Sequence, residues 1–481
     1  MLYKGLIFQI ANSLFFVLCS YIVHYFLGQN MTPTEYGTWG IILVILDFEY
    51  LFVNNGVRQA VAREIAYKRY DTIDVIKKSV ILQMILACGL SIFTFLIAPY
   101  LAIAFHDSSL ELYIKIVAVI LPFTGIYVIT QGVHNGLLLL ERESIIGILY
   151  SLLKLSIMPL CLWTSFSMVI NAELGYIFAA AGAMFIGTIS LYQKRQNMIK
   201  NVGKISFKKF TKDALNYSFF FIIVSVALSI DTLILRIFVE KSEMIGFYTG
   251  AVNFGKISYY ILTAFFLVIL PIIAALYEKK EFEKLQETIY TVMILINVFV
   301  LPVPIFLIVS GKQLLVLFYG ADYGVASNAL LFLSLSDFFM GMIVLFHMIA
   351  EAMEKKKFSV VFSVSMIIVD ICLVSLLTVR IGMTGTALAS CLCTFVFLIA
   401  SYIYVSKLTG IMINRKLILS VGIAVLYGLF VREIFHWIHV KHIFVMIGAY
   451  VVLYVIYIFI MGVCKVIDIA TVWQMFRKYK G

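Results

Sequence analysis

Long uninterrupted apolar runs constrain this chain more than any other feature of its sequence. Of its 481 residues, 63% are hydrophobic and 13% are charged, and the mean hydropathy is +1.03. Soluble domains are about half apolar even when glycine is counted, so this composition excludes a water-soluble enzyme, a disordered chain and a coiled coil. A transmembrane barrel is excluded because its strands alternate apolar and polar residues. The sequence therefore predicts an all-α, polytopic membrane protein.

The apolar runs predict fourteen transmembrane helices, since a span needs about 20 predominantly apolar residues. No long soluble domain interrupts them, and the first run leads too directly into the second to be a cleaved signal peptide. The predicted spans are residues 6–28, 38–60, 79–104, 113–140, 144–165, 174–193, 214–239, 247–276, 289–310, 326–350, 358–379, 384–405, 416–435 and 442–463.

The distribution of positive charge predicts the orientation, because short cytoplasmic loops retain Lys and Arg. With a cytoplasmic N-terminus, 28 of the 37 Lys and Arg residues fall on the cytoplasmic side and 7 on the other side. We therefore expect both termini to be cytoplasmic. The net charge of +11 then belongs to basic loops, such as residues 204–212, that lie against anionic membrane lipids. No nucleic-acid partner is needed to explain it.

Two weak internal repeats predict the architecture. An offset of 209 residues pairs Gly37 with Gly246, and an offset of 213 pairs His134 with His347. Six spans separate the matched elements, so both halves run in the same direction and are related by a pseudo-twofold axis along the membrane normal. We expect two six-helix lobes facing a central cleft, followed by two additional transmembrane helices and a cytoplasmic tail. These three parts are residues 1–206, 207–405 and 406–481.

Ionisable side chains inside the predicted spans mark candidate functional positions, since each costs about 2.5 to 3.5 kcal/mol on insertion scales. Asp47 and Lys256 lie about nine residues inside their spans, which is about 14 Å and close to the midplane. Helical spacing also aligns polar side chains along spans one, two, seven and eight, as a water-filled cleft would require. For any single serine in these rows, packing between helices is the simpler explanation.

Buried acids and histidines are candidates for ion or proton coupling. Histidine titrates near neutral pH, and a buried carboxylate is either paired or suited to carry a proton. Hydrogen-bonded core histidines and structural ion pairs are the alternative explanations. The coupling candidates are Asp47, Asp337, Asp370, His134 and His347.

Sequence motifs for catalysis and metal binding are not found. Asp47 and Glu49 resemble an acidic metal-binding pair, but helical spacing points them about 200° apart. The sequence contains no P-loop, no nucleophile elbow and no zinc-binding helix. The seven cysteines all lie in apolar runs and are interpreted as packing residues. We therefore expect no metal, no cofactor and no enzymatic activity.

Four stretches occur in a characteristic order along spans one to twelve. They are Met31–Gly40, Asn54–Arg63, Ile245–Tyr248 with Pro271, and Leu317–Gly320 followed by Tyr323 and Ala326. In this order they resemble the polysaccharide transporter family, the Wzx-type flippases of the MOP superfamily. The resemblance implies a V-shaped cleft between two lobes, lined largely by spans one, two, seven and eight, and transport by alternating access.

The resemblance also implies a cargo and its partners. The cargo would be a polyprenyl-pyrophosphate-linked oligosaccharide, moved from the cytoplasmic to the outer leaflet of the bacterial plasma (inner) membrane for O-antigen, capsule or exopolysaccharide assembly. A proton or sodium ion would be the coupling ion, and the polymerase of the same pathway would be a partner. The implied phosphate contacts are Arg58, Lys154 and Lys256, and the implied sugar contacts are Asn54, Gln9, Ser225 and Tyr260.

Two other functions stay open from the sequence. A MATE-type antiporter that exports organic cations would use the acids rather than the lysines, and Asp47, Asp337 and Asp370 would neutralise much of the positive charge in the cleft. A membrane polymerase or glycosyltransferase would instead form product from a donor substrate.

Overall fold

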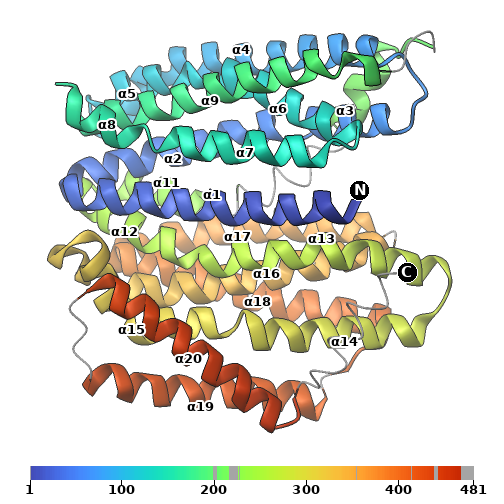
Figure 1. The fold of residues 1–481 in the computed structure, drawn as a ribbon. Coiled ribbons are helices and arrows are strands. Elements are labelled where there is room, and N and C mark those ends of the chain that lie inside the picture. The colour runs from blue at the N-terminus through green and yellow to red at the C-terminus, as the bar shows by residue number, and fades with distance from the viewer. Residues whose placement is uncertain are drawn as a thin grey trace. The chain divides into compact units, whose positions relative to one another are not determined.

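The computed structural model describes residues 2–198, 203–215, 226, 228–353, 355–412, 414–437 and 442–466, and these residues form helices and loops without any β-strand (Figure 1). The predicted all-α membrane class is therefore confirmed. Twelve helical segments within the described residues are long and apolar enough to cross a membrane, and each overlaps a predicted span. Part of predicted span 214–239 lies outside the described residues, and so do some side chains of predicted span 247–276. The count of fourteen spans therefore stays a prediction.

The chain divides into two compact units, Met1–Gly246 and Phe247–Gly481. The boundary falls inside α12 (Ser242–Gly255), and the three-part division expected above stays a prediction. The first unit contains α1 (Leu2–Asn30), α2 (Pro33–Asn54), α3 (Val57–Ala66), α4 (Thr72–Ala104), α5 (Leu110–Ala118), α6 (Ile120–Gly136), α7 (Leu140–Lys154), α8 (Ile157–Trp163), α9 (Met168–Gln193) and α11 (Ile230–Phe238). The second contains α13 (Ile257–Glu278), α14 (Phe282–Phe299), α15 (Pro302–Tyr319), α16 (Ser327–Ala352), α17 (Lys356–Ile381), α18 (Met383–Thr409), α19 (Arg415–Trp437) and α20 (Ile443–Val463).

The second predicted span is two helices rather than one. Thr32 and Glu35 form a capping box that starts α2, with Pro33 as its first residue. The span breaks after α2 at Gly56, whose φ of +83° lies in the region that favours glycine. Its N–H donates to the side chain of Gln59 at 2.7 Å, which satisfies one free donor at the start of α3. The break places Arg58 in the first turn of α3.

A basic segment of residues 203–215 docks on the first unit through its apolar side chains. Ile205, Phe210 and Ala214 are buried in a cluster with residues of α3, α4 and α6. The side chain of Asp74 accepts the N–H of Ile205 at 3.0 Å and also pairs with Lys78. The lysines between these apolar positions are exposed. The segment is therefore amphipathic, as an element that lies along a membrane surface would be.

The last two helices pack on a break between α14 and α15. Pro302 has no N–H to continue the helix, so carbonyl groups just before it lack their usual intrahelical partners. The hydroxyl of Tyr457 donates to the carbonyl of Asn297 at 3.0 Å, and that of Tyr454 donates to Phe299 at 2.8 Å. Both tyrosines belong to α20, which crosses obliquely beside α19 in Figure 1. Helix α20 therefore supports this break.

Candidate functional site

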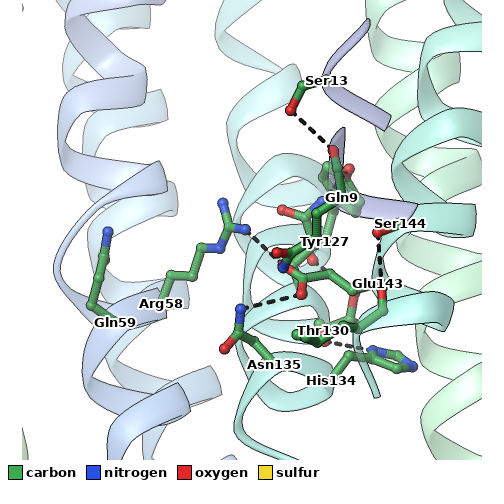
Figure 2. A network of polar contacts seen from close by, with 12 residues as sticks. Gln9, Ser13, Arg58, Gln59, Tyr127, Thr130, His134, Asn135, Glu143 and Ser144 are labelled. Carbon is green, nitrogen blue, oxygen red and sulfur yellow. Dashed lines mark hydrogen bonds and ion pairs between the residues drawn. The ribbon is translucent and has the colours of Figure 1, made fainter. Parts of the chain in front are cut away.

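An arginine–glutamate pair joins three helices of the first unit. Nη2 of Arg58 on α3 lies 2.9 Å from Oε1 of Glu143 on α7, and Nδ2 of Asn135 on α6 donates to Oε2 of the same carboxylate at 3.2 Å. The Glu143 side chain is 6% exposed and that of Arg58 is 36% exposed. Figure 2 shows the other terminal nitrogen of Arg58 pointing away from the carboxylate. One end of the guanidinium is thus fixed, and the other is accessible.

Tyrosines connect this pair to a second cation. The ring of Tyr127 on α6 stacks on that of Tyr150 on α7, with centroids 5.1 Å apart. Nε2 of Gln131 donates to the hydroxyl of Tyr127 at 2.6 Å. These residues lie between the Arg58 cluster and Lys154, which is the last residue of α7. The stacked tyrosines therefore link the Arg58 cluster to Lys154 inside the first unit.

Lys154 is enclosed by aromatic rings. Its Nζ lies 4.7 Å from the ring centroid of Phe16, 5.0 Å from that of Tyr150 and 4.4 Å from that of Tyr176. The residue is 5% exposed, and the carboxylate of Asp47 is close enough to interact with it electrostatically. Cation–π contacts of this kind stabilise a desolvated ammonium by about 2 kcal/mol or more. In this conformation the rings, rather than an open cleft, surround the lysine.

Two further carboxyl groups are buried in the membrane-spanning part of this unit. Glu49 is 6% exposed and accepts a hydrogen bond from Thr94. Glu173 on α9 is completely buried, and neither of its oxygens has a hydrogen-bond partner among the described residues. Because an ionisable group at bilayer depth is costly to keep, both positions are functional candidates.

The second unit places the predicted residues around the junction of α12 and α13. Lys256 is half-buried between these two helices. Oδ2 of Asp337 on α16 would lie 2.8 Å from a Cβ added to Gly255, so this carboxyl lies against the backbone next to Lys256. Tyr260 is 50% exposed, and its ring contacts that of Tyr259. The junction of α12 and α13 therefore places Lys256 close to Asp337 and Tyr260.

The two predicted histidines have matching environments. His134 on α6 is fully buried, with Nδ1 2.7 Å from the carbonyl oxygen of Thr130 and Nε2 2.8 Å from Oγ of Ser190 on α9. His347 on α16 is 1% exposed, with ring nitrogens 3.2 Å from Oγ of Ser363 and 3.3 Å from Oγ of Ser401. Hydroxyl and carbonyl groups thus contact both nitrogens of each ring, as in a hydrogen-bonded core histidine.

The remaining predicted residues that the structure describes lie on α1, α2 and α17. Asn54 is the last residue of α2. Gln9 lies on α1 beside Ser13, whose hydroxyl donates to its carbonyl oxygen at 3.1 Å (Figure 2). Asp370 on α17 is buried near Cys393. Ser225 lies outside the described residues. All seven cysteines are free, and no group of three His, Cys, Asp or Glu residues that could hold a metal occurs in the described part of the chain.

Sequence reasoning missed Glu143, Asn135, Glu173 and the rings around Lys154. Glu143 lies 85 positions from Arg58, so no local spacing indicates the pair. The only sequence signal for Glu143 is an acidic residue in the first turn of an otherwise apolar span.

Comparisons with known proteins agree with this architecture. A family model described as "Polysaccharide biosynthesis protein" matches residues 27–328. The capsular polysaccharide biosynthesis protein CapF of Staphylococcus aureus is 24% identical over 433 residues, which cover 84% of this chain and 99% of CapF.

Two solved structures share the fold. The lipid II flippase MurJ, in an inward closed conformation, matches with a TM-score of 0.72 at 12% identity and covers 96% of this chain and 98% of its own. A multidrug resistance MATE family transporter of the MOP superfamily, in an inward-facing conformation, matches with a TM-score of 0.67 at 14% identity. That match covers 84% of this chain and 98% of the transporter. The predicted MATE-like fold is thereby confirmed.

Proposed function

Since the chain belongs to the polysaccharide biosynthesis protein family, we propose that it is a flippase for polyprenyl-pyrophosphate-linked oligosaccharides. It would move the repeat unit from the cytoplasmic to the outer leaflet by alternating access, for the assembly of a surface polysaccharide. The observation that carries this proposal is the accessible guanidinium of Arg58, which is paired with Glu143 in a helical segment apolar and long enough to cross a membrane. Cationic groups within such segments are rare and mark substrate or ion pathways.

The chemistry of the cargo fits the donors of Arg58. A pyrophosphate presents several oxygens to hydrogen-bond donors, and arginine binds phosphate in a planar, often bidentate geometry. The donors of Arg58 other than Nη2 have no hydrogen-bond partner among the described residues. We assign the pyrophosphate to Arg58, and sugar hydroxyls to Gln9 and Asn54.

Lys154 would contribute only after a rearrangement. Its Nζ is surrounded by rings from α1, α7 and α9, so a phosphate could reach it only if Phe16 moved away. Phe16 is 43% exposed, which makes it the outermost of the three rings. In the second unit, Lys256 and Tyr260 would contact the cargo. Ser225, outside the described residues, stays a predicted sugar contact.

The remaining proposals concern coupling and environment. Asp47, Asp337, Asp370, His134 and His347 are our candidates for proton or sodium coupling, and the polymerase of the pathway is the proposed partner. We place the protein in the bacterial plasma (inner) membrane with both termini in the cytoplasm. In that orientation the basic segment 203–215 faces the anionic headgroups of the cytoplasmic leaflet.

Transport by the purified protein tests this function. We would reconstitute it in vesicles that contain a fluorescent polyprenyl-pyrophosphate-linked oligosaccharide and measure access of a membrane-impermeant glycosidase. Arg58→Gln is expected to lower the rate at least about tenfold, because a charge-assisted hydrogen bond contributes about 1.5 to 3 kcal/mol. Lys115→Gln, which removes a half-buried cation paired with Glu111, is the matched control.

Three results would contradict the proposal. Transport by Arg58→Gln at the wild-type rate would refute the assigned site. Export of organic cations that is lost in Asp47→Asn would indicate a MATE-type antiporter. Formation of a glycan product from donor substrate would indicate an enzyme.

A further inference from the structure

Glu143 has a specific place relative to the accessible cation. Both of its oxygens are engaged, Oε1 by Arg58 of α3 and Oε2 by Asn135 of α6, and the carboxylate is almost fully buried. Two donors from two different helices hold it, so it cannot swing away without breaking both bonds. Arg58 is therefore presented together with a fixed negative charge.

A ligand anion at Arg58 would meet that negative charge. An oxygen bound to the other donors of the guanidinium would lie only about 4 to 5 Å from the Glu143 carboxylate, given N–H···O distances of about 2.9 Å. Like charges at such a separation repel each other even when the site is partly hydrated. The carboxylate thus opposes the binding of any anion that Arg58 attracts.

Weaker binding of the anion at Arg58 is useful to a transporter. A binding site must be favourable enough for the cargo to enter and weak enough for it to leave. An isolated arginine in a partly desolvated site would hold a pyrophosphate tightly and slow its release. The paired arginine binds the same group more weakly, yet in a fixed orientation.

We infer that Glu143 is a counter-ion that sets the affinity of Arg58 for the pyrophosphate of the cargo by competing for the same guanidinium. This role rests on the proposed function, because it takes Arg58 as the pyrophosphate contact. It assigns to Glu143 a part in cargo release rather than in cargo attraction.

The test compares the affinity of inorganic pyrophosphate for the purified full-length protein and its variants in detergent, measured by calorimetry. Glu143→Gln retains the shape and an oxygen acceptor but removes the charge. We expect it to bind pyrophosphate about three- to thirtyfold more tightly than the wild type. Glu143→Asp, whose carboxylate is drawn back from Arg58 by one methylene, should shift the affinity in the same direction by less. Glu111→Gln removes a charge from the half-buried pair with Lys115 and should leave the affinity unchanged.

The vesicle assay provides a second readout. A counter-ion role predicts that Glu143→Gln lowers both KM and kcat, because binding tightens and release slows. A purely structural role predicts a lower kcat without tighter binding. In the double variant Arg58→Gln/Glu143→Gln, pyrophosphate should bind no better than in Arg58→Gln alone.

The outcomes separate this inference from the function on which it rests. If Arg58→Gln loses pyrophosphate binding while Glu143→Gln and Glu143→Asp bind it no more tightly than the wild type, the counter-ion role is wrong and the flippase proposal stands. If Arg58→Gln changes neither binding nor transport, both the assignment of Arg58 as the pyrophosphate contact and the counter-ion role are wrong. If the wild type itself moves no cargo in the vesicle assay, the flippase proposal is wrong.

Discussion

Gly37 of α2 packs backbone to backbone against Gly246 of α12. A Cβ added to Gly37 would lie 2.7 Å from the amide nitrogen of Gly246, and one added to Gly246 would lie 3.1 Å from the amide nitrogen of Gly37. These are the two residues that the sequence repeat pairs at an offset of 209. The contact leaves no room for a side chain at either position.

Substitution of either glycine should separate the two helices. Gly37→Ala and Gly246→Ala are each expected to destabilise the protein by about 1–3 kcal/mol, because the added methyl group meets backbone that cannot rotate away. Gly89→Ala on α4 is the matched control, since a Cβ there meets nothing within 4 Å. Thermal unfolding in detergent measures the difference. Equal melting temperatures for all three variants would contradict the close contact.

The rings around Lys154 predict a stability effect that is separate from transport. Phe16→Leu keeps an apolar side chain but removes one of the three ring faces. We expect a loss of about 0.5 to 2 kcal/mol from the missing cation–π contact. Leu14→Ala, at a position that is 68% exposed on the same helix, should have little effect. A Phe16→Leu variant as stable as the wild type would show that the ring does not contribute.

The tyrosine contacts to the α14–α15 break predict that α20 stabilises the second unit. Tyr454→Phe and Tyr457→Phe each remove a hydroxyl bound to a carbonyl group, at a cost of about 1 kcal/mol each. Tyr100→Phe, at a position that is 71% exposed, is the control. Chemical denaturation followed by tryptophan fluorescence would measure the change. The tyrosine contacts would be unimportant if the three variants unfolded alike.

The basic segment predicts a dependence on anionic lipid. A hydrogen bond to the hydroxyl of Tyr70 at 2.9 Å raises the pKa of Lys209 above its ordinary value, so this ammonium stays charged at physiological pH. Replacing Lys208, Lys209 and Lys212 by Gln should weaken the stabilisation by phosphatidylglycerol by about 1 kcal/mol per lysine near the surface. The stabilisation by lipid is measured as the difference between melting temperatures in detergent with and without phosphatidylglycerol. Wild-type lipid dependence in the triple variant would contradict the surface role.

The sequence predicted the helical membrane class and the family resemblance because both depend on local patterns. Apolar runs reveal spans, and the stretch from Met31 to Gly40 is read without reference to the rest of the chain. The apolar pattern predicts that the second span begins at residue 38, whereas α2 begins five residues earlier, at Pro33. The start of α2 is signalled by a capping box, Thr32 followed three residues later by Glu35. These residues are polar, so a search for apolar runs does not detect them.

The site could be predicted only in part, because its geometry depends on contacts between distant segments. Arg58 and Lys154 stand out in sequence as cations inside apolar runs. The partner of Arg58 and the rings around Lys154 come from helices that sequence spacing cannot relate to them. The sequence shows the residues that cause the breaks, Gly56 and Pro302. It does not show which side chains bind the carbonyl groups that a break leaves free.

The break between α14 and α15 has a consequence for how the chain tolerates irregular backbone in lipid. In a soluble protein, water would hydrate the carbonyl groups left bare at Asn297 and Phe299, but the bilayer interior offers none. The phenol groups of α20 take the place of water by donating hydrogen bonds to these two carbonyl groups. A variant lacking α19 and α20 would therefore need either an uninterrupted helix at this depth or another source of hydroxyl groups to take their place.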